Sequence, residues 1–325
     1  MDLSVAIVKE ESRFPLPAVK FLEQFKGDTF SEASARGLRH PLGMYNLSIA
    51  TVAKAFKETL DATEARKAKF LNNAQSKEED EHLILSLDSL LDTVVEHFDD
   101  AKGIMCVFAD REDQTAGRKM LNDFSSTIKE ARNFSAKQAN EIKHRQARVR
   151  LIRISNQQVF IPGYFIEGVS TDGAICPNPI IHDGGNTAFS IGRSLRTLVC
   201  SVYFLSNALP VLATPKKTVA AKIQPTGFGQ LLPVFDRLLQ LDKYVFYDEI
   251  DKCPAIVETA NKISISTKSR SIYQPPPQGC RIELEYTGDG MSRTFKLPYG
   301  GKDIPVSSSA PFKKKKPYFE FRQNH

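Results

Sequence analysis

The stretch IKHRQARVRLIRIS, residues 142–155, marks the point where the chain changes its hydrophobic rhythm. Before it, apolar residues recur at helical spacing, whereas within and after it they alternate in the manner of a strand. The change predicts an α+β fold, in which an N-terminal helical part precedes a mixed or antiparallel sheet with helices. The same stretch concentrates basic side chains, namely Lys143, His144, Arg145, Arg148, Arg150 and Arg153.

Upstream of this point the pattern predicts long helices. Apolar residues define one buried helical face over residues 46–60. A second helix is expected to begin at SKEE, residues 76–79, which has the spacing of a capping box. GIMCVFAD, residues 103–110, has the length and composition of a strand, and a third helix is expected to follow it to about Arg145.

Downstream, strands and helices are mixed. VRLIRIS (149–155) and QVFIPGYFIEGV (158–169) are rich in β-branched and aromatic residues, as strands prefer. The stretch 184–205 predicts a helix capped by Asn186 or Thr187, because short polar side chains accept hydrogen bonds from the first turn. FGQLLPVFDRLLQL (228–241) predicts another helix, which begins or bends at its proline.

The C-terminal part is expected to be mostly β. KISIS (262–266) reads as one strand, and the segments 281–287 and 291–297 read as two more. Gly288, Asp289 and Gly290 lie between these two segments and supply the turn.

Four regions follow from these patterns. Residues 1–45 form an extended arm with one short helix, because prolines interrupt the apolar pattern there. Residues 46–146 form a helical domain, and residues 147–311 form an α+β domain with a basic surface. Residues 312–325 form a lysine-rich tail. One continuous domain is the alternative to a boundary near residue 146.

Charge is distributed unevenly along the chain. Residues 1–145 carry 21 Lys/Arg against 24 Asp/Glu, whereas residues 146–325 carry 23 against 14. An excess of this kind favours a polyanionic partner for the second half. It would equally allow the acidic half of one copy to dock on the basic half of the next, so a homo-oligomer is expected.

The remaining composition excludes several classes of protein. The five cysteines are widely spaced without a CxxC pair, and the N-terminus lacks the pattern of a secretory signal, so a reducing, intracellular setting is expected. The apolar run 197–213 is too short and too polar to predict a membrane span. P-loop, GxGxxG, GxSxG and HExxH motifs are absent, which lowers the expectation of an enzyme.

The basic side chains are the first candidates for a function. On a β-strand, Arg148 and Arg150 share one face, and Phe160, Tyr164 and Phe165 follow nearby. Proteins that bind single-stranded nucleic acid place cations against phosphates and aromatic rings against bases, and this stretch offers both. A charged, solvent-facing strand edge is the alternative. The predicted nucleic-acid contacts are Lys143, Arg145, Arg148, Arg150, Arg153, Arg193, Arg196, Lys216 and Lys217, with Lys313, Lys314, Lys315 and Lys316 in the tail.

Two other groups of side chains are weaker candidates. Cys176, His182 and Asp183 lie in a Pro- and Gly-rich stretch and are metal-ligating types, but no second ligand pair supports them. The acids of YDEID, residues 247–251, could hold Mg²⁺, although such a run is common without a metal. We therefore expect no metal and no cofactor.

The resulting hypothesis is a non-enzymatic, nucleic-acid-associated subunit of a larger assembly, of which a viral nucleoprotein is one example. Its basic C-terminal half would bind the phosphate backbone, with single strands favoured and DNA or RNA left open. The first alternative is a shell or tube subunit that self-assembles without nucleic acid. The second is a metal-dependent nuclease that uses His182 with Asp248, Glu249 and Asp251.

Overall fold

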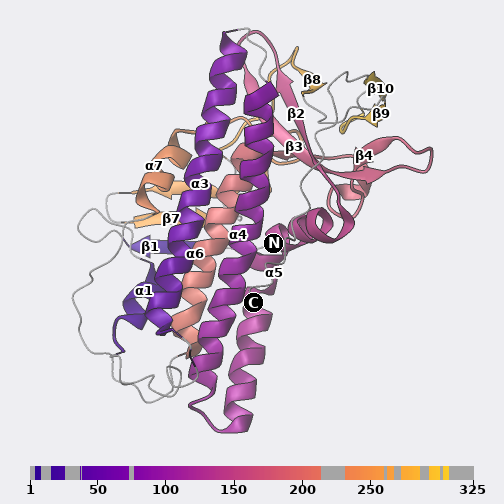
Figure 1. Cartoon of the computed structure of the whole chain (residues 1–325). Helices are drawn as coiled ribbons and strands as arrows, with labels where there is room; N and C mark the ends of the chain where they lie inside the picture. The colour runs from indigo at the N-terminus through magenta and orange to yellow at the C-terminus, as the bar shows by residue number, and fades with distance from the viewer. Residues whose placement is uncertain are drawn as a thin grey trace, which may run out of the picture.

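The α+β fold is confirmed by a computed structural model of the chain, in which an N-terminal helical region precedes a mixed sheet with further helices (Figure 1). The structure describes residues 4–8, 16–25, 37, 39–72, 77–213, 231–259, 262–266, 272–285, 293–300 and 303–306. Ser76, the expected cap in SKEE, and the turn at 288–290 lie outside these residues, whereas Lys77 begins the helix expected there.

Three long helices lie side by side in the helical region (Figure 1). They are α3 (Pro41–Leu71), α4 (Lys77–Ala109) and α5 (Gln114–Arg145). The strand expected at 103–110 is wrong, because that segment is the last part of α4. Its apolar side chains Ile104, Met105 and Phe108 are buried among the helices, and a short apolar run alone does not distinguish a strand from a buried helical segment.

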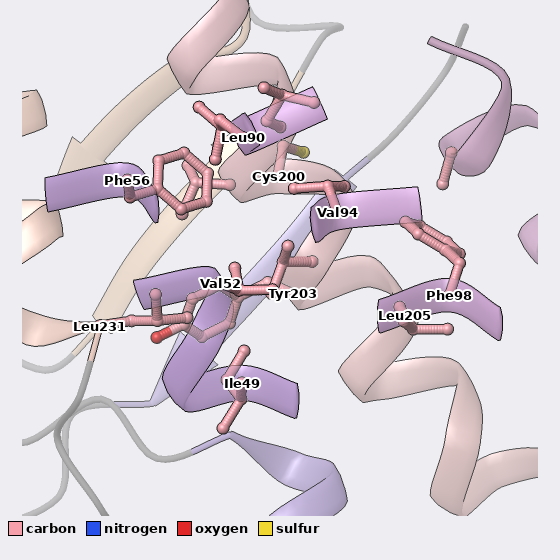
Figure 2. Close-up of a cluster of buried hydrophobic side chains, with 14 of the residues drawn as sticks. Ile49, Val52, Phe56, Leu90, Val94, Phe98, Cys200, Tyr203, Leu205 and Leu231 are labelled. Atoms are coloured by element: carbon pink, nitrogen blue, oxygen red, sulfur yellow. The ribbon is translucent and has the colours of Figure 1, made fainter. Parts of the chain in front are cut away.

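A fourth helix, α6 (Ile191–Ala213), comes from the second half of the chain and completes the helical core. It contacts α1 (Pro17–Leu22), α4, α5 and α7 (Leu232–Gln240). Figure 2 shows Cys200 and Tyr203 of α6 among Phe56 of α3 and Val94 of α4. By length and composition α6 could cross a membrane, but 72% of its most apolar window is buried inside the fold, as in a core helix.

The start of α6 differs from expectation. Asn186 and Thr187 lie upstream of it, and β5 (Phe189–Ser190) intervenes and pairs with β3. The hydroxyl of Ser190 accepts a hydrogen bond from the backbone N–H of Arg193 at 3.3 Å. Ser190 therefore does the capping expected of Asn186 or Thr187, because pairing with β3 keeps the chain extended as far as this residue.

The main sheet has the order β10-β9-β4-β3-β2-β8, and β5 pairs with β3. The predicted strands 149–155 and 158–169 are confirmed as β2 (Val149–Ser155) and β3 (Phe160–Val169), which are antiparallel. The others are β4 (Ile175–Pro177), β8 (Arg281–Leu284), β9 (Arg293–Lys296) and β10 (Asp303–Val306). A short 3-10 helix covers Asp183–Gly185.

The two segments expected on either side of a turn do not pair with each other. β8 pairs with β2, whereas β9 pairs with β4 and β10 on the other side of the sheet. A smaller sheet joins β1 (Ser4–Val8), β7 (Lys262–Ser266) and β6 (Ala255–Glu258). The predicted strand at 262–266 is thereby confirmed, and so is the short helix α1 in the N-terminal arm.

A cluster of charged side chains joins the helical layer to the main sheet. Arg66 of α3 lies 2.5 Å from Asp80 of α4 and 2.6 Å from Glu285, which follows β8. Arg153 of β2 contacts the same Glu285 at 2.8 Å and also contacts Glu283. The buried Arg66 and the partly buried Arg153 thus both meet carboxylates, which offsets the cost of removing these charges from water.

Candidate nucleic-acid interface

The arginine row expected on β2 is not a free cationic surface. Arg150 is 1% exposed, and its Nε and Nη2 both donate to Oε2 of Glu167 on β3, at 2.9 and 2.5 Å. Its guanidinium also lies 5.4 Å from the ring centre of Phe295. Arg150 is therefore an internal cation, and the expectation that it shares an open face with Arg148 is wrong.

Arg153 is partly buried and contacts Glu283 and Glu285, while its guanidinium lies 5.2 Å from the ring centre of Phe70. Glu283 lies in β8, which pairs with β2, and Glu285 directly follows it; both acids are about 130 residues further along the chain than Arg153. Arg153 therefore joins elements of the fold in this structure.

The aromatic side chains near this row are also inside the protein. Phe160, Tyr164 and Phe165 are 3%, 0% and 0% exposed. The Tyr164 hydroxyl donates to Gln138 Oε1 at 2.9 Å and lies 3.1 Å from Ser194 Oγ. These rings offer no face to a base, so the expected stacking surface on β3 is wrong.

Arg196 in α6 is 3% exposed and caps another helix. Its Nη2 donates to the carbonyl oxygens of Leu238, Leu241 and Asp242 at 3.4, 3.1 and 3.3 Å, at the C-terminal end of α7. A cation is stabilised there by the negative end of the helix dipole. Arg196 is thus buried in the fold rather than on the exposed helix face.

Arg193 has a mixed environment. Its Nη1 lies 3.1 Å from Oε1 of Glu249, a fully buried carboxylate that also accepts hydrogen bonds from the backbone N–H groups of Ser190 and Phe246. Burial raises the pKa of Glu249, and the cation of Arg193 opposes that rise. The other side of Arg193 faces a cavity.

Exposed positive charge is retained where α5 turns into β2. We define the α5–β2 corner as Lys137, His144, Arg145 and Arg148, all of which are exposed. Gln146 adopts a left-handed conformation with φ 55° and turns the chain out of the helix. Residues 131–166 contain seven Lys/Arg and one acid, Glu141.

The neighbours of the corner neutralise it only in part. Arg145 lies 3.4 Å from Glu141, yet its side chain is 67% exposed. Lys143, another predicted contact, lies 3.1 Å from Asp92 on α4 and is 44% exposed. Surface pairs of this kind contribute little to stability, so both cations are available to a partner with higher negative charge.

A cavity of about 300 Å³ opens beside the corner, between α5 and the segment that leads into α6. We call it the α5 pocket. Its lining residues are Glu130, Asn133, Phe134, Lys137, Gln138, Ile180, Ile181, Phe189 and Arg193. Lys137 therefore belongs both to the corner and to the rim of the pocket.

Two phenylalanine rings and a guanidinium meet in this pocket. The ring centres of Phe134 and Phe189 are 5.3 Å apart, and the guanidinium carbon of Arg193 lies 5.9 and 5.1 Å from them. Within the described part of the chain, Nε of Arg193 is buried without a hydrogen-bond partner. Sequence reasoning identified Arg193 but missed Lys137 and both rings, because they come together only through the packing of α5 on the 180–193 segment.

The metal candidates do not converge. Among the described residues, no three His, Cys, Asp or Glu side chains are placed to hold an ion. His182 is buried, its Nε2 accepts a hydrogen bond from the N–H of Ile166 at 2.9 Å, and burial lowers its pKa to about 3. Asp248 contacts Tyr299 and Lys252, and Asp251 is exposed.

Another polar pair lies beside a separate cavity of about 290 Å³ in the helical region, and the sequence did not reveal it. Ser48 Oγ on α3 and His97 Nδ1 on α4 are 2.9 Å apart. Burial lowers the pKa of His97 to about 4, so its imidazole is neutral near pH 7.

Other predicted contacts, Lys216, Lys217, Lys313, Lys314, Lys315 and Lys316, lie outside the described residues. No protein-family model, no curated protein and no solved structure matches the chain. Function is therefore inferred from the chemistry of the corner and the pocket.

Proposed function

We propose that the protein is a non-enzymatic, nucleic-acid-associated subunit that holds the phosphate backbone on the α5–β2 corner. The observation that carries this proposal is the exposure of four lysine and arginine side chains, Lys137, Lys143, Arg145 and Arg148, in a 36-residue stretch that has one acid. Exposed lysine and arginine side chains bind phosphates and release counterions from the nucleic acid.

The corner supports this function better than the β2 face does. Arg150 and Arg196 are nearly inaccessible and already have protein partners. A phosphate could reach either one only by displacing those partners and disrupting the core. Arg145 and Arg148 are exposed, so a phosphate can reach them without disrupting the core.

The proposal is tested by fluorescence anisotropy of a labelled single-stranded oligonucleotide with the full chain, across a salt series. The double variant Arg145→Gln/Arg148→Gln should bind more weakly and lower the magnitude of the log–log salt slope by about 1.4, because each lost contact accounts for about 0.7 on a single strand. The matched control is Lys54→Gln on α3, whose side chain is 76% exposed and remote in sequence from the corner.

Two outcomes would overturn the proposal. One is the absence of binding by the unaltered chain at low salt. The other is a loss of binding free energy in the double variant that is no more than twice the loss in Lys54→Gln, since the number of charges removed rather than the corner would then control binding.

Self-association is the second part of the proposal, because the acidic first half and the basic second half of two copies are complementary. Light scattering after chromatography, before and after nuclease treatment, measures it. A particle that survives nuclease would favour a self-assembling shell or tube subunit, whereas one that dissociates would favour assembly on nucleic acid.

A further inference from the structure

We propose that the α5 pocket receives one unpaired base of the strand whose phosphates lie on the α5–β2 corner. This inference rests on the proposed function and adds the form of nucleic acid that the site selects. It also gives a role to the place where Arg193, Phe134 and Phe189 meet.

The position of the pocket suits a strand that crosses the corner. Lys137 lies on its rim, and His144 is two helical turns further along α5, about 10 Å at 1.5 Å per residue. Phosphates in one strand of a duplex are about 3.4 Å apart along the axis and are further apart in an extended strand. A few nucleotides therefore span the distance from the pocket to the corner.

The lining of the pocket suits the flat, apolar face of a base. Phe134, Phe189, Ile180 and Ile181 supply apolar walls. Bases stack on aromatic rings and on guanidinium planes in proteins that bind single strands. Arg193 also lines the pocket, and its guanidinium lies beside both rings, so the pocket combines the two kinds of surface on which bases stack.

The volume of the pocket limits what it can hold. About 300 Å³ is at the lower end of the range for small-ligand pockets, which is enough for one base but not for a base pair. A base in a duplex would have to leave the helix to enter, and that unpairing costs a few kcal/mol. The pocket therefore selects single strands over duplexes.

The test compares two oligonucleotides and two variants of the full chain. The oligonucleotides are a labelled single strand and the same strand in which abasic residues replace its internal nucleosides, so that phosphates are kept and bases are removed. The variants are Phe134→Leu, which keeps an apolar side chain without a ring, and Phe70→Leu. Phe70 is also half-buried, but it stacks on Phe160 outside the pocket.

We expect Phe134→Leu to bind the ordinary strand at least fivefold more weakly, since one stacked base contributes about 1–3 kcal/mol. Its affinity for the abasic strand and its salt slope should match those of the unaltered chain, because phosphate contacts are untouched. Phe70→Leu should bind both strands as the unaltered chain does.

The outcomes separate the two proposals. If Phe134→Leu binds both strands as well as the unaltered chain does, or loses affinity for both equally, the base pocket is overturned while phosphate binding at the corner stands. If the unaltered chain binds neither strand at low salt, the proposed function fails and the pocket inference fails with it.

Discussion

Arg150 and Glu167 form an internal ion pair across neighbouring strands, in which two guanidinium nitrogens donate to one carboxylate oxygen at 2.9 and 2.5 Å. The arginine is 1% exposed, whereas the side chain of the glutamate is 18% exposed. The pair shows that a basic sequence run can be neutralised inside the fold by acids from other elements.

Removing one member of this ion pair should lower the free energy of unfolding more than replacing both members with apolar side chains. Glu167→Gln is expected to destabilise the fold by about 3 kcal/mol, because it removes the carboxylate that faces the buried charge of Arg150. Arg150→Met/Glu167→Met should recover much of that loss, since apolar side chains of similar size need no desolvation of charge. Urea unfolding of the two variants measures the difference, and a double variant less stable than Glu167→Gln would contradict this account.

Buried histidine should make the protein sensitive to acid. Burial lowers the pKa of His97 to about 4 from an ordinary value of 6.5, so the unfolded chain takes up a proton that the folded chain does not. Stability is therefore unaffected above pH 6.5 and is lost as the pH falls from 6.5 to 4. His97→Gln should remove about 3 kcal/mol of that loss.

Unfolding midpoints of both proteins at pH 6.5, 5.5 and 4.5 provide the measurement. Parallel decreases in the two proteins would show that His97 is not the group responsible. His182, whose pKa is also lowered by burial, would contribute to any loss that remains in the variant.

Asp80 should act in the opposite direction over the same pH range. Burial raises its pKa to about 6 from 3.8, and the nearby Arg66 opposes that rise. The folded chain therefore binds a proton more tightly between pH 4 and 6, and the stabilisation from this proton is lost as the pH rises through 6.

Asp80→Asn is neutral at every pH and lacks this dependence. Its stability relative to the unaltered chain should increase from pH 4 to pH 7, as measured by urea unfolding at several pH values. A constant difference between the two proteins would show that Asp80 keeps its ordinary pKa in the fold.

Gly163 should tolerate no side chain. A Cβ there would lie 2.2 Å from Cζ of Phe246 and 2.6 Å from the carbonyl oxygen of Phe189. Gly163→Ala should therefore destabilise the fold by about 1–3 kcal/mol or prevent folding. Gly43→Ala in α3 is the matched control, because no atom lies within 4 Å of its Cβ, and it should stabilise by up to about 1 kcal/mol. Thermal unfolding of both variants measures the two effects. Equal effects of the two substitutions on the unfolding midpoint would contradict the close packing around Gly163.

The fold could be predicted where local periodicity determines the element. The rhythm change at residue 149 correctly placed β2 after α5, and Pro233 correctly placed the start of α7. The segment 103–110 was missed because its apolar residues suit either a strand or a buried helix, and only the neighbouring helices decide. The separation of β8 from β9 depends on pairing with β2 and β4, which no short window contains.

The site was predicted only in part, for the same physical reason. Charge and chain position correctly indicated basic exposure at Arg145 and Arg148. Whether Arg150 is free depends on Glu167, and whether Arg153 is free depends on Glu283 and Glu285, which are distant in sequence. A count of charges along the chain therefore overestimates the number of accessible cations wherever pairing of strands brings acidic side chains next to the basic ones.

The central place of α6 has a consequence for synthesis. The ribosome makes α4 and α5 before it makes residues 191–213, so the faces of these two helices that contact α6 lack their partner until α6 is complete. A nascent chain stopped near residue 146 would expose those apolar faces to other chains and to chaperones. The basic corner at residues 137–148 is also translated before α6, so under the proposed function the unfinished chain would carry its phosphate-binding side chains before its core is complete.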